Sequence, residues 1–93
     1  MVWAEYTEDA LTVTQGDPKT INSSATAMRS FCPDCGTGLF YRNAELLPNL
    51  VEVQLATLDH PDVLAPTMQI QTAERLGWMT HIDELPAFER FPE

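Results

Sequence analysis

The chain contains two cysteines, Cys32 and Cys35, which lie three positions apart in the segment Phe31-Cys32-Pro33-Asp34-Cys35-Gly36. Thiolates are good ligands for zinc, and a structural zinc site is almost always tetrahedral with four ligands. The proline and the following glycine favour a tight turn whose backbone N–H groups point at the sulfurs. The pair therefore predicts one half of a zinc site, and the two remaining ligands decide which chemistry the chain can support.

Two other interpretations of the cysteine pair are open. A redox pair of the thioredoxin type needs its first cysteine at the N-terminus of a helix, where the helix dipole lowers the thiol pKa. Here residues 36–41 have the composition of a strand, which argues against redox chemistry. In the third interpretation, Cys32 and Cys35 are small buried residues without a chemical role, because a free cysteine packs like a small hydrophobic residue.

The other candidate metal ligands do not form a second pair with suitable spacing. His60 precedes Pro61 and is expected in a solvated turn, and His81 is expected to be a hydrogen-bonded surface residue. The sequence contains no glycine-rich phosphate loop and no nucleophile elbow. We therefore predict that Cys32 and Cys35 are metal ligands, and we assign no residue to catalysis.

Length, composition and charge predict one small soluble domain that spans residues 1–93. The chain is 44% apolar and 20% charged, which is ordinary for a folded domain. Its net charge of -9 would repel phosphate backbones and anionic lipids, so we expect no nucleic-acid partner and no membrane partner. No apolar run is long enough to span a membrane and the N-terminus lacks a secretory signal, so we expect a cytoplasmic protein with reduced thiols.

Short alternating apolar and polar runs, separated by turn residues, predict an all-β fold with strands joined by hairpins. The run at 50–58 places Val51 and Val53 on one face, and this face is expected to line the core. A turn is expected at 16–18, and the cysteine turn is expected at the tip of a hairpin. Strands are predicted at 2–6, 11–15, 19–22, 27–31, 39–42, 50–58 and 68–72, with single helical turns at 59–62 and 72–76.

The C-terminal segment at 78–93 contains prolines and aromatic residues at irregular spacing, which predicts a packed tail. Large aromatic side chains in a small β domain usually belong to its core. We therefore expect four of them to be buried, namely Trp3, Trp78, Phe88 and Phe91.

Residues 29–42, RSFCPDCGTGLFYR, closely resemble the signature of the glutathione-dependent formaldehyde-activating enzyme family, which also includes centromere protein V. The likeness continues through residues 11–18 and 51–61 and through the ending at 85–92. This resemblance implies a β-tent fold, in which two antiparallel sheets are held by a structural zinc with four cysteine ligands. Cys32 and Cys35 match the C-terminal pair of those ligands, on a zinc-knuckle hairpin.

The resemblance also implies what this chain lacks. The family's N-terminal cysteine pair, and the cysteine cluster of its catalytic zinc, belong to a segment that would precede Met1. The chain then corresponds to the C-terminal portion of the fold, a truncated or minimal domain missing its N-terminal strands. The resemblance implies that relatives are carbon–sulfur lyases, which act on adducts of glutathione and formaldehyde with the catalytic zinc as a Lewis acid. Because the chain lacks the cysteines of that zinc, we expect a zinc-binding but catalytically silent member.

Two alternative functions remain open, and so do two ways in which two copies of the chain could associate. The chain is alternatively an active carbon–sulfur lyase whose partner is a glutathione-like small molecule, or a thiol redox protein that uses Cys32 and Cys35. A homodimer could complete the zinc site, because a two-fold interface brings identical residues together. Pairing between copies could also cover a sheet edge left open by the missing strands.

Overall fold

The computed structural model describes residues 1–92, and these residues contain five strands and five short 3₁₀ helices but no α-helix. None of these helices has the length and apolar character needed to cross a membrane. The strands are β1 (Trp3–Thr7), β2 (Lys19–Ser24), β3 (Ala27–Phe31), β4 (Gly38–Asn43) and β5 (Leu50–Gln54). The 3₁₀ helices are η1 (Glu8–Ala10), η2 (Leu55–Thr57), η3 (Pro61–Val63), η4 (Thr72–Glu74) and η5 (Gly77–Glu84).

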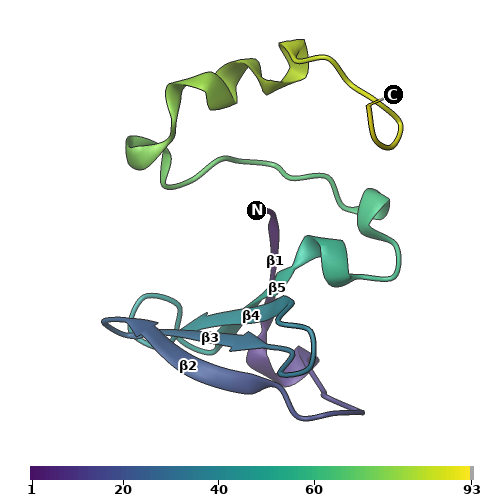
Figure 1. The fold of residues 1–93 in the computed structure, drawn as a ribbon. Helices are drawn as coiled ribbons and strands as arrows, with labels where there is room; N and C mark the ends of the chain where they lie inside the picture. The colour runs from purple at the N-terminus through teal and green to yellow at the C-terminus, as the bar shows by residue number, and fades with distance from the viewer. Residues whose placement is uncertain (93) are drawn as a thin grey trace.

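All five strands form one antiparallel sheet in the order β1-β5-β4-β3-β2 (Figure 1). Strands β2, β3, β4 and β5 follow one another across the sheet, whereas β1 pairs with β5, the strand farthest from it along the chain. The predicted all-β class is confirmed. The second sheet expected for a β-tent is not among the elements of residues 1–92, which form this single sheet.

Most predicted strands are confirmed with small shifts at their ends, but three predictions need correction. The strand expected at 50–58 ends at Gln54 and continues as η2, where the Leu55 N–H donates to the Val2 carbonyl at 2.9 Å. The strand expected at 11–15 is an irregular loop, and so is most of the one expected at 68–72, where Gln71 adopts a left-handed φ of 55°. Alternating residues there found no neighbouring strand with which to pair.

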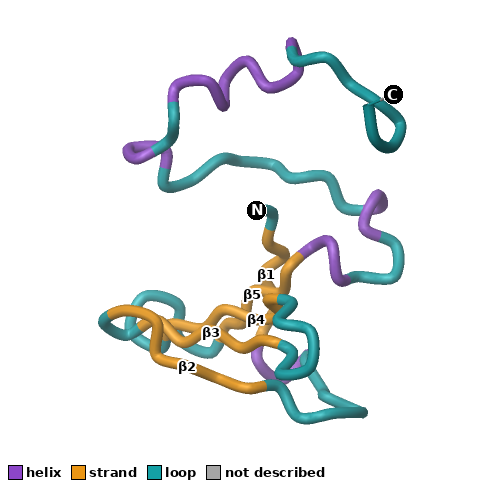
Figure 2. The backbone as a smooth tube through the Cα atoms, in the orientation of Figure 1, coloured by secondary structure: helices purple, strands orange, loops and turns teal. Residues whose placement is uncertain are grey.

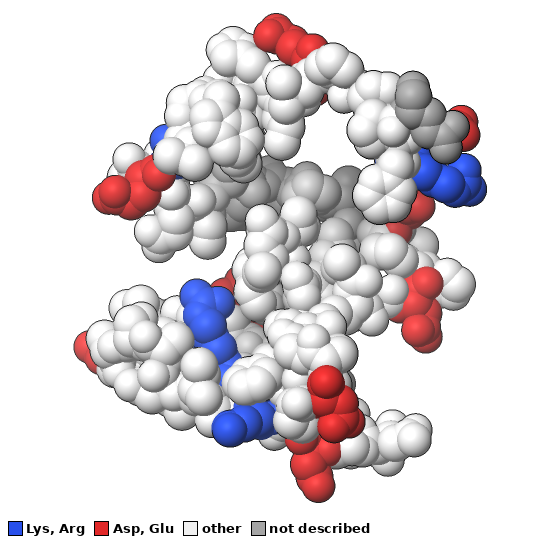
Figure 3. Space-filling model, in the orientation of Figure 1, with Lys and Arg blue, Asp and Glu red and all other residues white. Residues whose placement is uncertain are grey.

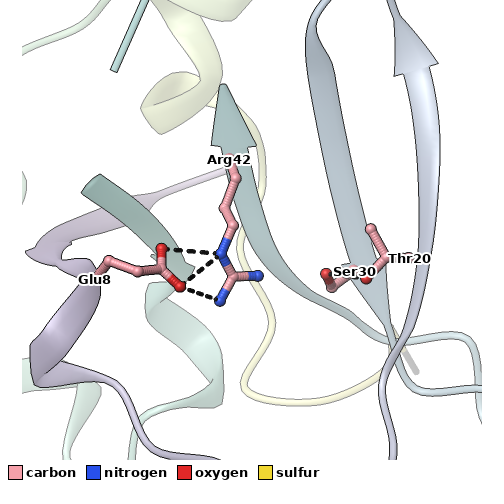
Figure 4. A network of polar contacts seen from close by, with 4 residues as sticks. All are labelled: Glu8, Thr20, Ser30 and Arg42. Carbon is pink, nitrogen blue, oxygen red and sulfur yellow. Dashed lines mark hydrogen bonds and ion pairs between the residues drawn. The ribbon is translucent and has the colours of Figure 1, made fainter. Parts of the chain in front are cut away.

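The buried core is small and lies on the sheet. Val51 is 0% exposed and Val53 is 7% exposed, which confirms the predicted inward face of β5, and Ala27 on β3 is also buried. The buried hydroxyl of Ser30 is satisfied by the Thr20 hydroxyl at 2.8 Å across β2 and β3 (Figure 4). Within residues 1–92, each buried polar side chain thus has a hydrogen-bond partner, as burial requires.

An ion pair joins the end of β1 to the middle of the sheet. The Arg42 Nε lies 3.0 Å from both carboxylate oxygens of Glu8, and its Nη2 lies 2.9 Å from Oε1 (Figure 4). The Glu8 N–H also donates to the Asn49 carbonyl at 2.8 Å. Helix η1 is therefore held to β4 and to the turn before β5.

We define the arm as residues 64–92, the part of the chain that follows η3 and carries η4 and η5. In Figures 1 and 2 it runs as loops and short helices away from the strands. The predicted packed tail is wrong, because Trp78 is 58% exposed, Phe88 56% and Phe91 87%. Only Trp3 of the four aromatic residues is partly buried, and its ring lies 6.4 Å from that of Tyr41.

Candidate metal-binding site

The cysteine turn lies at the tip of the hairpin between β3 and β4, as predicted. Strand β3 ends at Phe31, so Cys32 begins the turn, and its N–H donates to the Thr37 carbonyl at 2.9 Å. The Gly36 N–H donates to the Cys32 carbonyl at 2.8 Å, and Gly36 has a φ of +78°. Glycine reaches this left-handed conformation without the steric cost of a Cβ atom. The turn is thus closed by two backbone hydrogen bonds.

Both cysteines are free thiols, and they differ in environment. Cys32 is half-buried and Cys35 is exposed, with the Cys35 Sγ 3.1 Å from the Thr37 hydroxyl oxygen. Hydrogen bonds from the Thr37 side chain, the Thr37 backbone and the Cys32 thiol lower the pKa of Cys35, against smaller opposing effects of desolvation and of the Asp34 charge. A lower pKa favours the thiolate, which is both the nucleophile and the form that binds a metal.

This geometry bears on the alternative interpretations of the pair. Cys35 is exposed, so it is not a small buried packing residue. Cys32 follows a strand and leads into a turn before another strand, so no helix begins at it, and the dipole effect used by thioredoxin-like pairs is not available. The thiol with the lowered pKa is the second cysteine, and its stabilisation comes from local hydrogen bonds.

The cysteine turn offers two thiol donors of the kind that zinc prefers. Within residues 1–92 no group of three or more His, Cys, Asp or Glu side chains is placed to hold a metal ion. His60 and His81 are exposed, as expected, and the His81 Nδ1 lies 3.6 Å from a Glu84 carboxylate oxygen. Two thiols at a closed turn fit two corners of a tetrahedral zinc site. The assignment of Cys32 and Cys35 as metal ligands stays a prediction.

Two grooves lie on the surface away from the thiols. The first, of about 520 Å³, has mainly apolar walls that include Val2, Leu55 and Leu64, and it lies where the arm leaves the sheet. The second, of about 510 Å³, is lined by polar and acidic residues around Glu8. Neither cysteine lines either groove, so a small molecule that reacts with the thiols would meet them at the open hairpin tip.

One face of the sheet carries a polar cluster that sequence reasoning missed. The Arg29 guanidinium lies 4.9 Å from the centre of the Tyr41 ring, and Tyr41 is paired in register with Glu52. Glu52 in turn pairs with Glu5, and burial together with the negative charge of Glu5 raises the pKa of Glu52. These residues come from four different strands. The alternation of side chains along each strand was the only signal in the sequence that could have placed these residues on one face of the sheet.

These elements define a class, namely an antiparallel β protein with a paired-cysteine turn at the tip of a hairpin. A family model described as glutathione-dependent formaldehyde-activating enzyme matches residues 1–74. The chain belongs to this family, which confirms the resemblance seen around the cysteine pair. The likeness over residues 75–92 stays a prediction, because the match ends within the arm. No curated protein matched the chain, and no solved structure did.

Proposed function

We propose that the chain is a zinc-binding member of this family in which Cys32 and Cys35 supply two of the four ligands. The observation that carries this proposal is the closed hairpin turn, which holds both free thiols at an exposed tip. Support also comes from the lowered pKa of Cys35, because proton competition for a metal-binding thiolate is then weaker. Family membership adds support, since the family is generally associated with zinc.

The remaining two ligands come, in this proposal, from the same cysteines of a second copy. A two-fold axis through the zinc would place four thiolates around it, two from each copy, and four cysteines are a common structural donor set. The hairpin tip is exposed at Cys35, so the approach of a second hairpin is not blocked by this residue's surroundings. The sheet edges, β1 and β2, offer a second place for pairing, and their pairing between copies stays a prediction.

A zinc ion held by four thiolates has a structural role. Catalytic zinc keeps one position open for water or substrate, whereas a site with four protein ligands is closed. The chain has only two cysteines and so cannot build a second cysteine cluster of its own. We therefore propose that this chain, as it stands, binds zinc and assembles without performing the carbon–sulfur chemistry of its relatives.

Metal analysis of the purified full chain together with its solution mass tests the proposal. We expect about half a zinc ion per chain in a dimer, because one tetrahedral site would be shared by two copies. Cys32→Ser and Cys35→Ser should each abolish tight binding, while Ser23→Ala, in strand β2, should bind zinc as the wild type does. One tightly held zinc per monomer, or no zinc at all, would contradict the shared site.

The active-lyase alternative is tested with the same zinc-loaded protein. We expect no consumption of formaldehyde in the presence of glutathione beyond the reaction without protein. A zinc-dependent rate that Cys35→Ser removes would show that the chain is an active enzyme with a glutathione adduct as substrate. The Ser23→Ala variant again serves as the control, because it keeps both thiols.

A thiol redox function is the second candidate, and the exposed Cys35 with its lowered pKa favours it. It predicts that metal-free protein reduces a small disulfide in repeated turnovers with a dithiol reductant. Thr37→Val removes the hydroxyl that stabilises the Cys35 thiolate and should slow alkylation of this thiol. Repeated turnover that zinc does not suppress would favour the redox function over zinc binding.

A further inference from the structure

The chain exposes far more surface than a compact protein of its size. Its accessible surface is 8047 Å², whereas a compact monomer of 10.4 kDa exposes about 5,400 Å². Its radius of gyration is 15.6 Å, against about 12 Å expected for a compact chain of this length. The excess exposed area is therefore about 2,600 Å² by the same scaling.

Many of the exposed large apolar side chains belong to the arm. The arm makes up about a third of the chain, yet it carries ten of the eighteen large apolar side chains that are exposed in the described residues. These ten are Leu64, Met68, Ile70, Leu76, Trp78, Met79, Ile82, Leu85, Phe88 and Phe91. A stable monomer rarely exposes so many large apolar side chains in one segment, so these side chains need a covering surface.

The arm does not find that surface on its own sheet. The strands pack against their neighbours in the sheet and η2 packs against η3, but neither η4 nor η5 packs extensively against a strand. The arm's backbone hydrogen bonds are local, as in the donation of the Met79 N–H to the Leu76 carbonyl at 3.0 Å. No residue of η4 or η5 is buried.

The distribution of charge favours the arm as a contact between identical copies. Two chains of net charge -9 repel each other, but the arm holds four carboxylates and two arginines, so it contributes -2 of that charge. Figure 3 shows Asp and Glu side chains mainly along the outline of the visible face, with uncharged side chains between them. Contact through the arm therefore brings together apolar surface at a low electrostatic cost.

The area also fits a dimer. Obligate homodimers bury about 2,000–5,000 Å² in total, or about 1,000–2,500 Å² from each partner. The excess exposed area of about 2,600 Å² per chain is therefore comparable with the area that each partner buries in the largest of these interfaces.

We propose that the arm is a dimerisation arm, which packs against the arm of a second copy across a two-fold axis. The contact is isologous, so the exposed apolar side chains of η5 and of the tail face the same residues of the other copy. This inference concerns residues 64–92 and does not depend on zinc or on either cysteine.

Sedimentation equilibrium of the full chain, with EDTA present, tests the arm directly. We expect a species of twice the 10.4 kDa chain mass in the wild type. Ile82→Asp places a charge on the arm at a side chain that is 53% exposed and should weaken association at least tenfold. Leu46→Asp makes the same chemical change at a side chain that is 72% exposed, outside the arm, and should dimerise like the wild type.

Several outcomes would overturn the proposal. A wild type that stays monomeric at all concentrations shows that a second copy does not cover the arm. Resistance of the arm to proteolysis in that monomer would then show that its own chain covers it. Equal weakening by both substitutions places the contact elsewhere. A dimer that EDTA dissociates but that Ile82→Asp leaves intact is bridged by the cysteine site alone. That outcome would support the shared zinc site and contradict dimerisation through the arm.

Salt and fluorescence give independent measurements. Added NaCl should strengthen the dimer, because it screens repulsion between two negatively charged chains; weakening by salt would indicate ion pairs and contradict an apolar contact. In a Trp3→Phe background, Trp78 is the single tryptophan. Its emission should shift to the red as the protein is diluted, and an emission independent of concentration in the dimer range would place Trp78 outside the contact.

Discussion

The sheet and the arm both carry many apolar side chains, but only the sheet buries any of them fully. On β5, Val51 and Val53 lie between neighbouring strands and are almost completely covered. In the arm, Trp78 and Phe91 stay largely exposed although their side chains are larger. In a sheet, the side chains of paired strands cover one another, whereas the apolar side chains of an irregular segment are covered only if another surface packs against them.

The two regions also differ in how their backbones are held. The sheet joins residues far apart in sequence, as in the pairing of Trp3 with Gln54 between β1 and β5. The arm has local bonds, such as that from Arg75 N–H to the Thr72 carbonyl at 3.1 Å. Segments with few buried contacts open at low free energy, so we expect the sheet to determine the global stability of a single chain.

The largest expected effect comes from the fully buried side chain of Val51 on β5. Val51→Ala should lower the free energy of unfolding by about 2–3 kcal/mol, because two buried methyl groups are lost and a cavity remains. Val13→Ala removes the same atoms from a side chain that is 48% exposed and should stay within about 0.5 kcal/mol of the wild type. Urea unfolding at a fixed protein concentration measures both, and similar losses would contradict a core centred on β5.

The next largest effect comes from substituting glycines, and it distinguishes backbone strain from a role in metal binding. Gly36→Ala and Gly16→Ala both place a Cβ at a left-handed φ, +78° and +80°, with no atom within 4 Å of it. Each should therefore cost about 1–2 kcal/mol of stability from strain alone. Only Gly36→Ala should also weaken zinc binding, because Gly36 closes the cysteine turn. Equal effects on zinc affinity in a competition with a chelator dye would show that the turn geometry is not part of the site.

A smaller change in stability is expected when ion pairs are removed, and it should differ between the sheet and the arm. Arg42→Ala removes the two-pronged contact with Glu8 and should lower stability by about 0.5–1 kcal/mol, less at high salt. Arg90→Ala removes a contact of 3.9 Å in the arm between side chains that are almost fully exposed, and it should not change stability. Thermal melts at low and high salt measure the difference. Loss of stability in Arg90→Ala alone would reverse the comparison.

The smallest effect depends on pH. Because the pKa of Glu52 is raised in the folded state, the folded chain retains this proton at pH values where the unfolded chain has released it. Wild-type stability should therefore fall as the pH rises from the unfolded pKa through the folded one. Glu52→Gln should raise stability by less than about 1 kcal/mol at neutral pH and have no effect at acid pH. Glu74→Gln, on the exposed arm, is the control, and an equal gain there would exclude the pairing with Glu5 as the cause.

Local sequence patterns predicted much of the fold. Strand β3 was predicted at its observed bounds, and the cysteine turn was placed correctly. The turn expected at 16–18 is a bend at 15–16, where Gly16 has a φ of +80°. The inward face of β5 also followed from alternation, which places Val51 and Val53 on one side. These features depend on neighbouring residues, so the chemistry of a short segment is enough to predict them.

Other features could not be predicted because they depend on partners distant in the chain. Residues 11–15 and 68–72 alternate like strands, yet neither became one, since a strand forms only where another offers its hydrogen-bonding groups. The neighbours of Tyr41 come from other strands, so their proximity follows from the register of the sheet. The two-sheet β-tent, the single domain over 1–93 and the cytoplasmic location stay predictions.

By itself, the order of residues determined most of the strand-forming segments, the position of the thiol pair at a tight turn and the family to which the chain belongs. Tertiary structure alone decided that β1 closes the sheet against β5, that Glu5 faces Glu52, and that Phe91 lies uncovered. The division has a physical basis. Turn and strand preferences arise from dihedral angles within a few residues, while burial and electrostatic neighbours arise from surfaces that meet only after the chain has folded.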